Sequence, residues 1–498
     1  MPVERRTHRL GRLLLGVFLT FLGGALCARA QEPLPPGIEA LPSDVLEPQT
    51  AAPAALTLDE VLASVERAYP LLAAAVQERR IAGGEQLSAA GAFDLRLDAF
   101  NETGALGFYQ TNRARIAAEQ PLQSGGKVLS GYRVGRGEFE PWYLERQTNL
   151  GGEFFAAASQ PLLQNRAIDK RRAGVAKTTI ARQAVEPDID KQRIYFYLSA
   201  SEKYWKWVAA GHAHRIARGL LTIAQQRGVA IEQRVRAGDL PAIEQTDNER
   251  LIVSRQAKLI DADRKFRQAA VELSLFIRDE TGQPIVVPAA QLAEFPEPSL
   301  PDERQYHSDI EAALQIRPEL RYLRLQRQKA AVELTLARNQ QLPSLDVGML
   351  AAQDVGQQTP KGDKTPFQLE AGLYFGVPLQ RRQATGQVRT SEGEMAQIAA
   401  KERYASDRVV ADVQFAFTGL TTSYDELQQA RRGVELALRM EQAERERFDR
   451  GDSNILFIQL REQATADARL LVVEAIGEYH VAAAEYRAAL GIDAQGGP

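Results

Sequence analysis

Two very long helical patterns constrain this fold more than any other feature, and each is broken by a Gly-Asp dipeptide and followed by a shorter helical arm. Residues 384–449 contain no proline, are rich in Arg, Glu, Gln and Ala, and end just before Gly451-Asp452. Residues 163–237 repeat the pattern before Gly238-Asp239, and Pro187 is predicted to interrupt or kink this helix. A helix of about 65 residues spans roughly 100 Å, more than any compact core, so we expect neighbouring chains or water beside it.

The arms that follow the two breaks match each other at a constant offset, which indicates an internal duplication. The matched pairs are Ala262 with Ala475, Phe266 with Tyr479, Ala269 with Ala482, Leu273 with Tyr486 and Ile277 with Leu490. We therefore divide the chain into a first repeat at 57–280 and a second repeat at 308–492, joined by a linker at 281–307. The turns of the two repeats are predicted at 238–241 and 451–454.

The N-terminus has the features of a secretory signal peptide at 1–30, with arginines before an apolar stretch and Ala28-Arg29-Ala30 as a cleavage site. Residues 31–56, rich in Pro and Ala, are predicted to form an extended tether. The signal carries five Arg and one Glu, so the formal charge becomes −3 − 4 = −7 without it, which disfavours nucleic acid as a partner. The single cysteine, Cys27, lies in the signal, so we expect no disulfide in the exported chain.

Several short segments alternate apolar and polar side chains, as β-strands do. The clearest, 367–377, places Phe, Leu, Ala, Leu, Phe and Val on one side and Gln, Glu, Gly, Tyr and Gly on the other. Its pattern fits a strand of a membrane β-barrel, and it fits a half-buried strand of a soluble sheet equally well. The first repeat also carries an insert near 105–140, which we expect to be hairpin material with a turn at Gly125-Gly126, forming either further barrel strands or an extracellular loop.

Apolar side chains in the last helical arm recur every three or four residues. We expect them to form one narrow buried seam, as in coiled coils. The members of this predicted seam are Leu456, Leu460, Ala464, Ala468, Leu471, Ala475, Tyr479, Ala482, Tyr486 and Leu490.

Each half of the chain reads as helix, two strands, long helix, Gly-Asp turn and shorter helix. With the run from Ala313 to Leu320 and the strand ends Pro161-Leu162 and Pro378-Leu379, this order resembles the TolC-like outer-membrane efflux proteins over 57–492. The resemblance implies a mainly α fold with a membrane β-barrel part, in which a homotrimer contributes four strands per copy to a 12-stranded barrel. The helices would form a long α-helical coiled-coil barrel in the periplasm, and the strands would lie in outer-membrane lipid.

In that family, the turns between long and short helices form a closable periplasmic tip. A periplasmic adaptor protein docks there and connects the duct to an inner-membrane pump. The positions that match this tip are Gly238 and Asp239 in the first repeat and Gly451 and Asp452 in the second.

The side chains that follow the tip turns are the candidates for a gate. The family's best-known members carry aspartates after the second glycine, where this chain has Phe457 and Leu460, so a hydrophobic constriction is expected in place of an acidic ring. Glu244, after the first glycine, is the acidic candidate, and Phe448, before the second turn, is a further gate candidate. An alternative interpretation of both phenylalanines is ordinary coiled-coil packing.

The sequence offers no site for catalysis, a cofactor or a metal. His212 and His214 are two residues apart and lack the i, i+4 spacing of a helical metal pair. A cysteine nucleophile is excluded after the signal, and no serine lies in a nucleophile-elbow context. We therefore interpret the chain as a passive outer-membrane exit duct of an efflux or secretion system. The alternative is a periplasmic coiled-coil scaffold whose strands form a small soluble sheet.

Overall fold

The computed structural model describes residues 54–141, 147–358 and 364–492, so the predicted signal at 1–30 and most of the predicted tether lie outside the described residues. The helices are α1 (Leu58–Ala68), α2 (Pro70–Ala90), α3 (Lys170–Arg236), α4 (Ala242–Ser274), α5 (Tyr306–Ile316), α6 (Pro318–Asn339), α7 (Arg382–Asp449) and α8 (Ile455–Leu490), with 3-10 turns η1 (Gly91–Phe93) and η3 (Ala289–Gln291). Among the residues described, no helix has the length and apolar character needed to cross a membrane.

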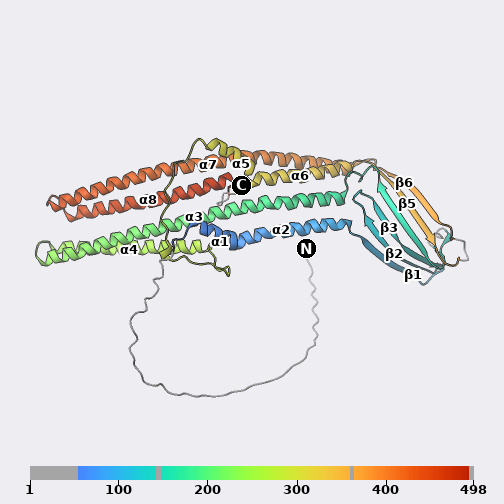
Figure 1. The fold of residues 1–498 in the computed structure, drawn as a ribbon, viewed down its shortest axis with the longest axis horizontal. Coiled ribbons are helices and arrows are strands. Elements are labelled where there is room, and N and C mark those ends of the chain that lie inside the picture. The colour runs from blue at the N-terminus through green and yellow to red at the C-terminus, as the bar shows by residue number, and fades with distance from the viewer. Residues whose placement is uncertain (1–53, 142–146, 359–363, 493–498) are drawn as a thin grey trace, which may run out of the picture. The chain divides into compact units, whose positions relative to one another are not determined.

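Six strands form one antiparallel sheet in the order of the sequence (Figure 1). They are β1 (Arg96–Gly104), β2 (Thr111–Pro121), β3 (Lys127–Gly137), β4 (Glu153–Pro161), β5 (Ser344–Asp354) and β6 (Gln368–Gly376). The expected number of four strands per chain is wrong, because the insert near 105–140 supplies β2 and β3 as full members of the sheet. The alternation in β2 is inconspicuous in the sequence because Ile116 is the one large apolar residue that alternates with the polar side chains.

The long helices pack in antiparallel pairs, α3 with α4 and α7 with α8 (Figure 1). Helix α3 runs for 67 residues and passes through Pro187 without a break, so the expected interruption there is wrong. Pro187 is buried, and α3 is in contact with α1, α2, α6 and α8, so tertiary packing compensates for the missing backbone donor. One residue before the proline, Glu186 accepts two hydrogen bonds from Arg79 of α2, of 2.8 and 2.7 Å.

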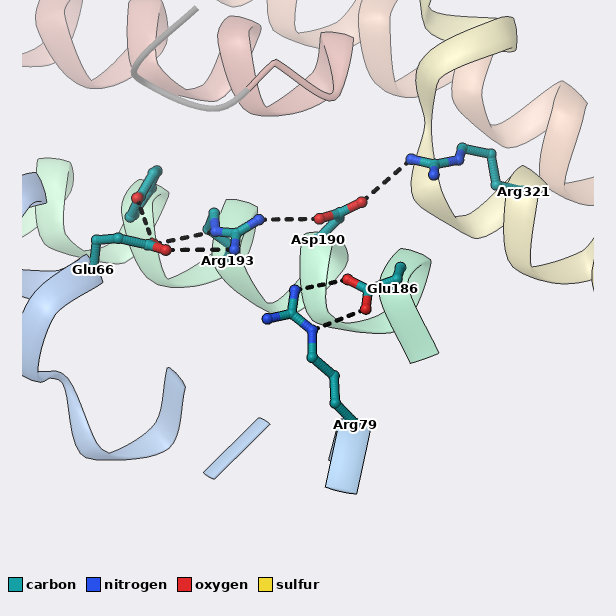
Figure 2. Close-up of polar contacts among 7 residues, drawn as sticks. Glu66, Arg79, Glu186, Asp190, Arg193 and Arg321 are labelled. Atoms are coloured by element: carbon teal, nitrogen blue, oxygen red, sulfur yellow. Dashed lines mark hydrogen bonds and ion pairs between the residues drawn. The ribbon is translucent and has the colours of Figure 1, made fainter. Parts of the chain in front are cut away.

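Charged side chains tie the first repeat to the second beside Pro187 (Figure 2). Arg193 of α3 contacts Glu66 of α1 at 3.1 Å and Asp190 at 3.0 Å. The other carboxylate oxygen of Asp190 reaches Arg321 of α6 at 3.2 Å. The row therefore crosses α3 and connects α1 to α6, elements that are far apart in the sequence.

An aromatic core lies between α1, α3 and α4. Trp207 and Leu273 are fully buried in it, and Phe266 and Phe276 are nearly so. The chain that follows α4 crosses over this core, because Leu292 packs against it. A smaller apolar cluster holds α5, α6, α7 and α8 together in the second repeat. These two clusters fix the ends of the helix pairs nearer to the sheet.

Candidate functional site

The two predicted tip turns have the same backbone geometry. Gly238 and Gly451 both have φ of 82°, a left-handed value that favours glycine. After Gly238, the Asp239 amide donates to the carbonyl of Arg234 at 2.9 Å, and after Gly451 the Asp452 amide donates to Arg447 at 2.9 Å. This is the Schellman pattern of a helix C-terminus, and it ends both long helices at equivalent positions.

The helices that leave the turns begin differently. The side chain of Asn454 caps α8 by accepting a hydrogen bond of 3.2 Å from the amide of Phe457. Helix α4 begins after Pro241, whose side chain has no atom that can accept a capping hydrogen bond. A side-chain cap thus joins the second turn to its helix, whereas at the first turn the Glu244 amide donates to the backbone carbonyl of Pro241 at 3.1 Å.

The predicted tip residues lie on the surface of the single chain. The glycines and aspartates of both turns are exposed, and Glu244 and Phe448 are half-buried. Phe457 is 48 % exposed and Leu460 is 55 % exposed, so packing within one chain does not account for them. Both remain candidates for a surface that faces water or another copy.

The buried face of α8 near the tip differs from the predicted seam. Leu456, Leu460 and Leu471 are half-exposed or more, whereas Ala475, Tyr479 and other members nearer the sheet are buried as expected. The correction has a physical cause, because polar groups occupy the interior face near the tip. The residues buried there are Ile458, Gln459, Glu462, Thr465 and Ala466.

Glu462 is the centre of a buried ion cluster that joins the two helix pairs. Its side chain is 2 % exposed and contacts Arg227 of α3. The second carboxylate oxygen lies 3.3 Å from Arg255 of α4, whose side chain is also 2 % exposed. Arg445 of α7 approaches the first oxygen at 3.5 Å. One carboxylate therefore contacts three other helices.

Burial lowers the pKa of Arg255 from its ordinary value, and the charge of Glu462 opposes that shift. Arg255 also donates to the carbonyl of Leu220 in α3, at 2.8 Å. Since guanidinium groups keep their proton in proteins, this site holds a buried cation whose counterion is Glu462. Removal of Glu462 would leave that cation without a partner.

A second buried carboxylate, Glu444 of α7, lies nearer the turn. It accepts a hydrogen bond from Ser453 in the turn itself and contacts Arg447 at 3.5 Å. Arg461 of α8 lies 4.0 Å from its other oxygen. Glu444 therefore couples the conformation of the turn at 450–454 to the packing of α7 on α8.

The sequence analysis missed both carboxylates. The available signal was positional: Glu462 stands four residues from Ile458 and four from Ala466, on one helical face with them. A glutamate on an otherwise apolar and small face requires a partner of opposite charge. Choosing Arg227 and Arg255 as that partner requires the tertiary arrangement.

The six-stranded sheet has two chemically different faces. The register brings Leu97, Ala118, Ser130 and Ala156 into one row across β1 to β4. The face that contains this row, called here the apolar face, carries large exposed side chains between 48 and 71 % accessible. These large side chains are Leu97, Ile116, Phe154, Met349, Leu369, Leu373 and Phe375.

The opposite face, called here the charged face, carries ion pairs between neighbouring strands. Arg133 of β3 donates two hydrogen bonds of 3.0 Å to Glu153 of β4, whose side chain is 2 % exposed. Arg113 of β2 contacts Glu102 of β1 at 2.6 Å. An apolar face opposite a charged face is the pattern of a wall between lipid and water.

The two histidines singled out in the sequence lie against different segments. His212 contacts the carbonyl of Ala293 at 3.0 Å, whereas His214 stacks on Phe266. Throughout 54–141, 147–358 and 364–492, no group of three or more His, Cys, Asp or Glu side chains could hold a metal ion.

Comparison with known proteins gives a family match over part of the chain and a shared fold over most of it. Residues 310–492 match the outer membrane efflux protein family. No curated protein sequence matches the chain. The outer membrane protein VceC from Vibrio cholerae is similar in structure, with a TM-score of 0.61 and 14 % identity over 87 % of this chain and 96 % of that one. The Neisseria gonorrhoeae MtrE outer membrane channel in its open state has a TM-score of 0.60 and 16 % identity, covering 87 % of this chain and 88 % of that one. The Campylobacter jejuni CmeC outer membrane channel has a TM-score of 0.59 and 12 % identity over 92 and 94 % of the two chains.

Proposed function

We propose that this chain, which belongs over residues 310–492 to the outer membrane efflux protein family and has the fold of TolC-like channels, forms a passive outer-membrane exit duct. TolC-like channels are trimers, and a trimer is the assembly proposed for this chain. Its work is transport, without bond chemistry. The helices would extend from the membrane into the periplasm.

The two-faced sheet is the observation that carries this proposal. Leu97 on β1 and Leu373 on β6, at the two edges of the sheet, are 68 and 71 % exposed. A soluble periplasmic scaffold would leave these side chains in water, at a cost of about 25 cal/mol per Å² of apolar surface. A position in lipid removes that cost and leaves the ion pairs of the charged face on the aqueous side.

Adjacent residues of β6 offer a matched test of the duct. Leu373→Arg places a charge on the apolar face, at a cost of about 2–4 kcal/mol near the bilayer midplane. Tyr374→Arg places the same charge on the other face, because successive side chains of a strand alternate. We expect detergent-dependent extraction and stepwise conductance in planar bilayers for wild type and Tyr374→Arg, and strongly reduced insertion for Leu373→Arg. Solubility without detergent and no conductance from wild type would favour the scaffold.

Gating at the periplasmic tip is the finer part of the proposal. The Glu462 cluster would hold α8 against α3 and α4. Separating these helices would leave Glu462, Arg227 and Arg255 without their partners of opposite charge, which is unfavourable for buried groups. Phe457 and Leu460, exposed in the single chain, would line the constriction when three copies meet. Opening would then require water or other charged groups to replace the ion-pair partners in the cluster.

Docking of a periplasmic adaptor is proposed at the two turns. Gly238-Asp239 and Gly451-Asp452 are exposed, and a Cβ placed on either glycine would meet nothing within 4 Å. A photo-crosslinker on Asp239→Cys and on Asp452→Cys tests the contact, since Cys27 is the only native cysteine. We expect both positions to capture the same coiled-coil partner in intact envelopes, and the exposed Lys401→Cys on α7 to capture none. Equal capture at all three positions would remove the turns as the docking site.

A further inference from the structure

The sheet of one chain ends in two strands that each have one unpaired edge. These strands are β1 and β6, each of nine residues. All neighbours are antiparallel and the sheet has six strands, an even number, so β1 and β6 run in opposite directions. The unpaired edge of β6 in one copy can therefore continue the antiparallel pattern into β1 of another copy.

The apolar face extends to both edges of the sheet. Leu97 on β1 and Leu369 on β6 are 68 and 63 % exposed on that face. On the charged face, Arg96 of β1 and Glu370 of β6 stand at the same row of the register, so the two edges carry opposite charges at that level. Unpaired backbone groups cost several kcal/mol each in lipid, so such edges must pair.

The β2–β3 hairpin is part of the sheet, and side-chain contacts join it to β4 and to the residues just before β4. Arg133 binds the buried Glu153 through two hydrogen bonds. The hydroxyl of Tyr132 donates to the carbonyl of Gly151 at 2.5 Å. Arg115 of β2 lies over the ring of Phe155, 5.7 Å from its centroid. Removal of the hairpin from the sheet would take Arg133 away from Glu153 and break both of these hydrogen bonds.

We infer that three copies of this chain close one barrel of 3 × 6 = 18 strands, in which β6 of each copy pairs with β1 of the next. This inference rests on the proposed function and adds the number of strands and the diameter of the barrel. With strands about 4.8 Å apart and tilted by about 40°, 18 strands give a diameter of roughly 36 Å, against roughly 24 Å for 12. The outer section of the duct thus suits bulky, hydrated cargo better than a 12-stranded barrel would.

One row of the apolar face provides the test, since the chain after residue 27 has no cysteine. Double-cysteine variants at Leu97 and Ala118 probe the β1–β2 contact, and variants at Ser130 and Ala156 probe the β3–β4 contact. Cysteines at Leu97 and Ala156 are the matched control, because three strand spacings of about 4.8 Å separate them, which is too far for a disulfide. In membranes we expect the first two pairs to crosslink within the chain and the third not to. Crosslinking of the third pair would show β1 beside β4, with the hairpin outside the wall, and would overturn the inference.

Direct imaging of the oligomer in lipid nanodiscs completes the test. The expected result is three copies and 18 strands in one closed ring, with cysteines at Leu97 crosslinking between copies to one of the apolar-face positions of β6. A conducting oligomer with 12 strands in the ring would refute the 18-stranded barrel and leave the duct intact. The absence of conductance from a well-folded wild type would refute both proposals. These two failures are therefore distinguishable.

Discussion

A carboxylate oxygen of Glu462 lies 3.3 Å from the guanidinium of Arg255, and the two side chains are each only 2 % exposed. The residues are 207 positions apart in the sequence. This single contact joins α8 of the second repeat to α4 of the first, about two helical turns from the start of α8 and about four from the start of α4. Buried charges thus join the two repeats near the tip.

Glu462→Gln should weaken the tip and increase the time that the duct spends open. The variant leaves Arg255 and Arg227 buried without a counterion, a loss we expect to cost about 3 kcal/mol. Open probability in planar bilayers and the thermal midpoint of the oligomer measure the two effects. Glu474→Gln, at an exposed glutamate of the same helix, should change stability by less than about 0.5 kcal/mol.

Combination with Arg255→Met checks that the effect arises from this pair. Removal of both buried charges should cost less than the sum of the two single changes, because the Arg255 cation is then no longer buried without its counterion, whereas Arg227 still lacks one. Strict additivity would mean that Glu462 acts through Arg227 or Arg445 instead.

Phe457→Ala should increase the single-channel conductance of the open state, because the aromatic ring is proposed to line the constriction. Phe457 is 48 % exposed in the single chain, and truncation removes most of its bulk. Phe415→Ala, at a 78 % exposed phenylalanine of α7 far from the turn, is the control and should leave the conductance unchanged. Equal conductance for wild type and both variants would assign Phe457 to contacts outside the narrowest section.

Arg133→Met should destabilise the sheet far more than Arg96→Met. The first change leaves the 2 % exposed Glu153 unpaired, at a cost of about 3–5 kcal/mol. The second breaks a pair with Asp98 in which the side chains are 74 and 42 % exposed, worth less than about 1 kcal/mol. Heat resistance of the oligomer on gels separates the two. Similar losses would mean that the burial of Glu153 does not set the cost of losing its partner.

Stability should fall as the pH drops below about 6.5, in part because of His480. Burial lowers the pKa of His480, which stacks on Trp205 at a centroid distance of 4.2 Å. The unfolded chain binds a proton at its ordinary pKa of about 6.5, where the folded chain does not, so the stability is complete above that value and decreases below it. Thermal midpoints between pH 5 and 8 should depend less on pH for His480→Gln than for wild type. The exposed His307→Gln should retain the wild-type dependence.

Long-range periodicity made the helices and their turns predictable. The matched glycines at 238 and 451 required left-handed backbone, and the structure has 82° at both. The strand at 367–377 was predictable because large apolar residues alternate there. In β2 the same face carries one large apolar residue, Ile116, between Ala114 and Ala118, so its pattern did not stand out, and the number of strands was underestimated.

The buried charges of the candidate site were not predictable from one sequence. Glu462 and Leu460 are close neighbours on α8. The periodicity of apolar residues predicts that the leucine is buried and the glutamate is exposed. The structure does the reverse, because Arg227 and Arg255 provide a partner for the carboxylate. Which face of a helix is buried then depends on side chains more than 200 positions away.

Because α3 is one continuous helix, a small tilt at one point would displace its far end. The helix is anchored at the fully buried Trp207 and continues to Arg236, about 44 Å farther at 1.5 Å per residue. A tilt of about 5° about that anchor would carry the far end by about 4 Å. A small adjustment in the aromatic core would thus produce a larger displacement at the turn, so side chains far from the proposed gate could change its width.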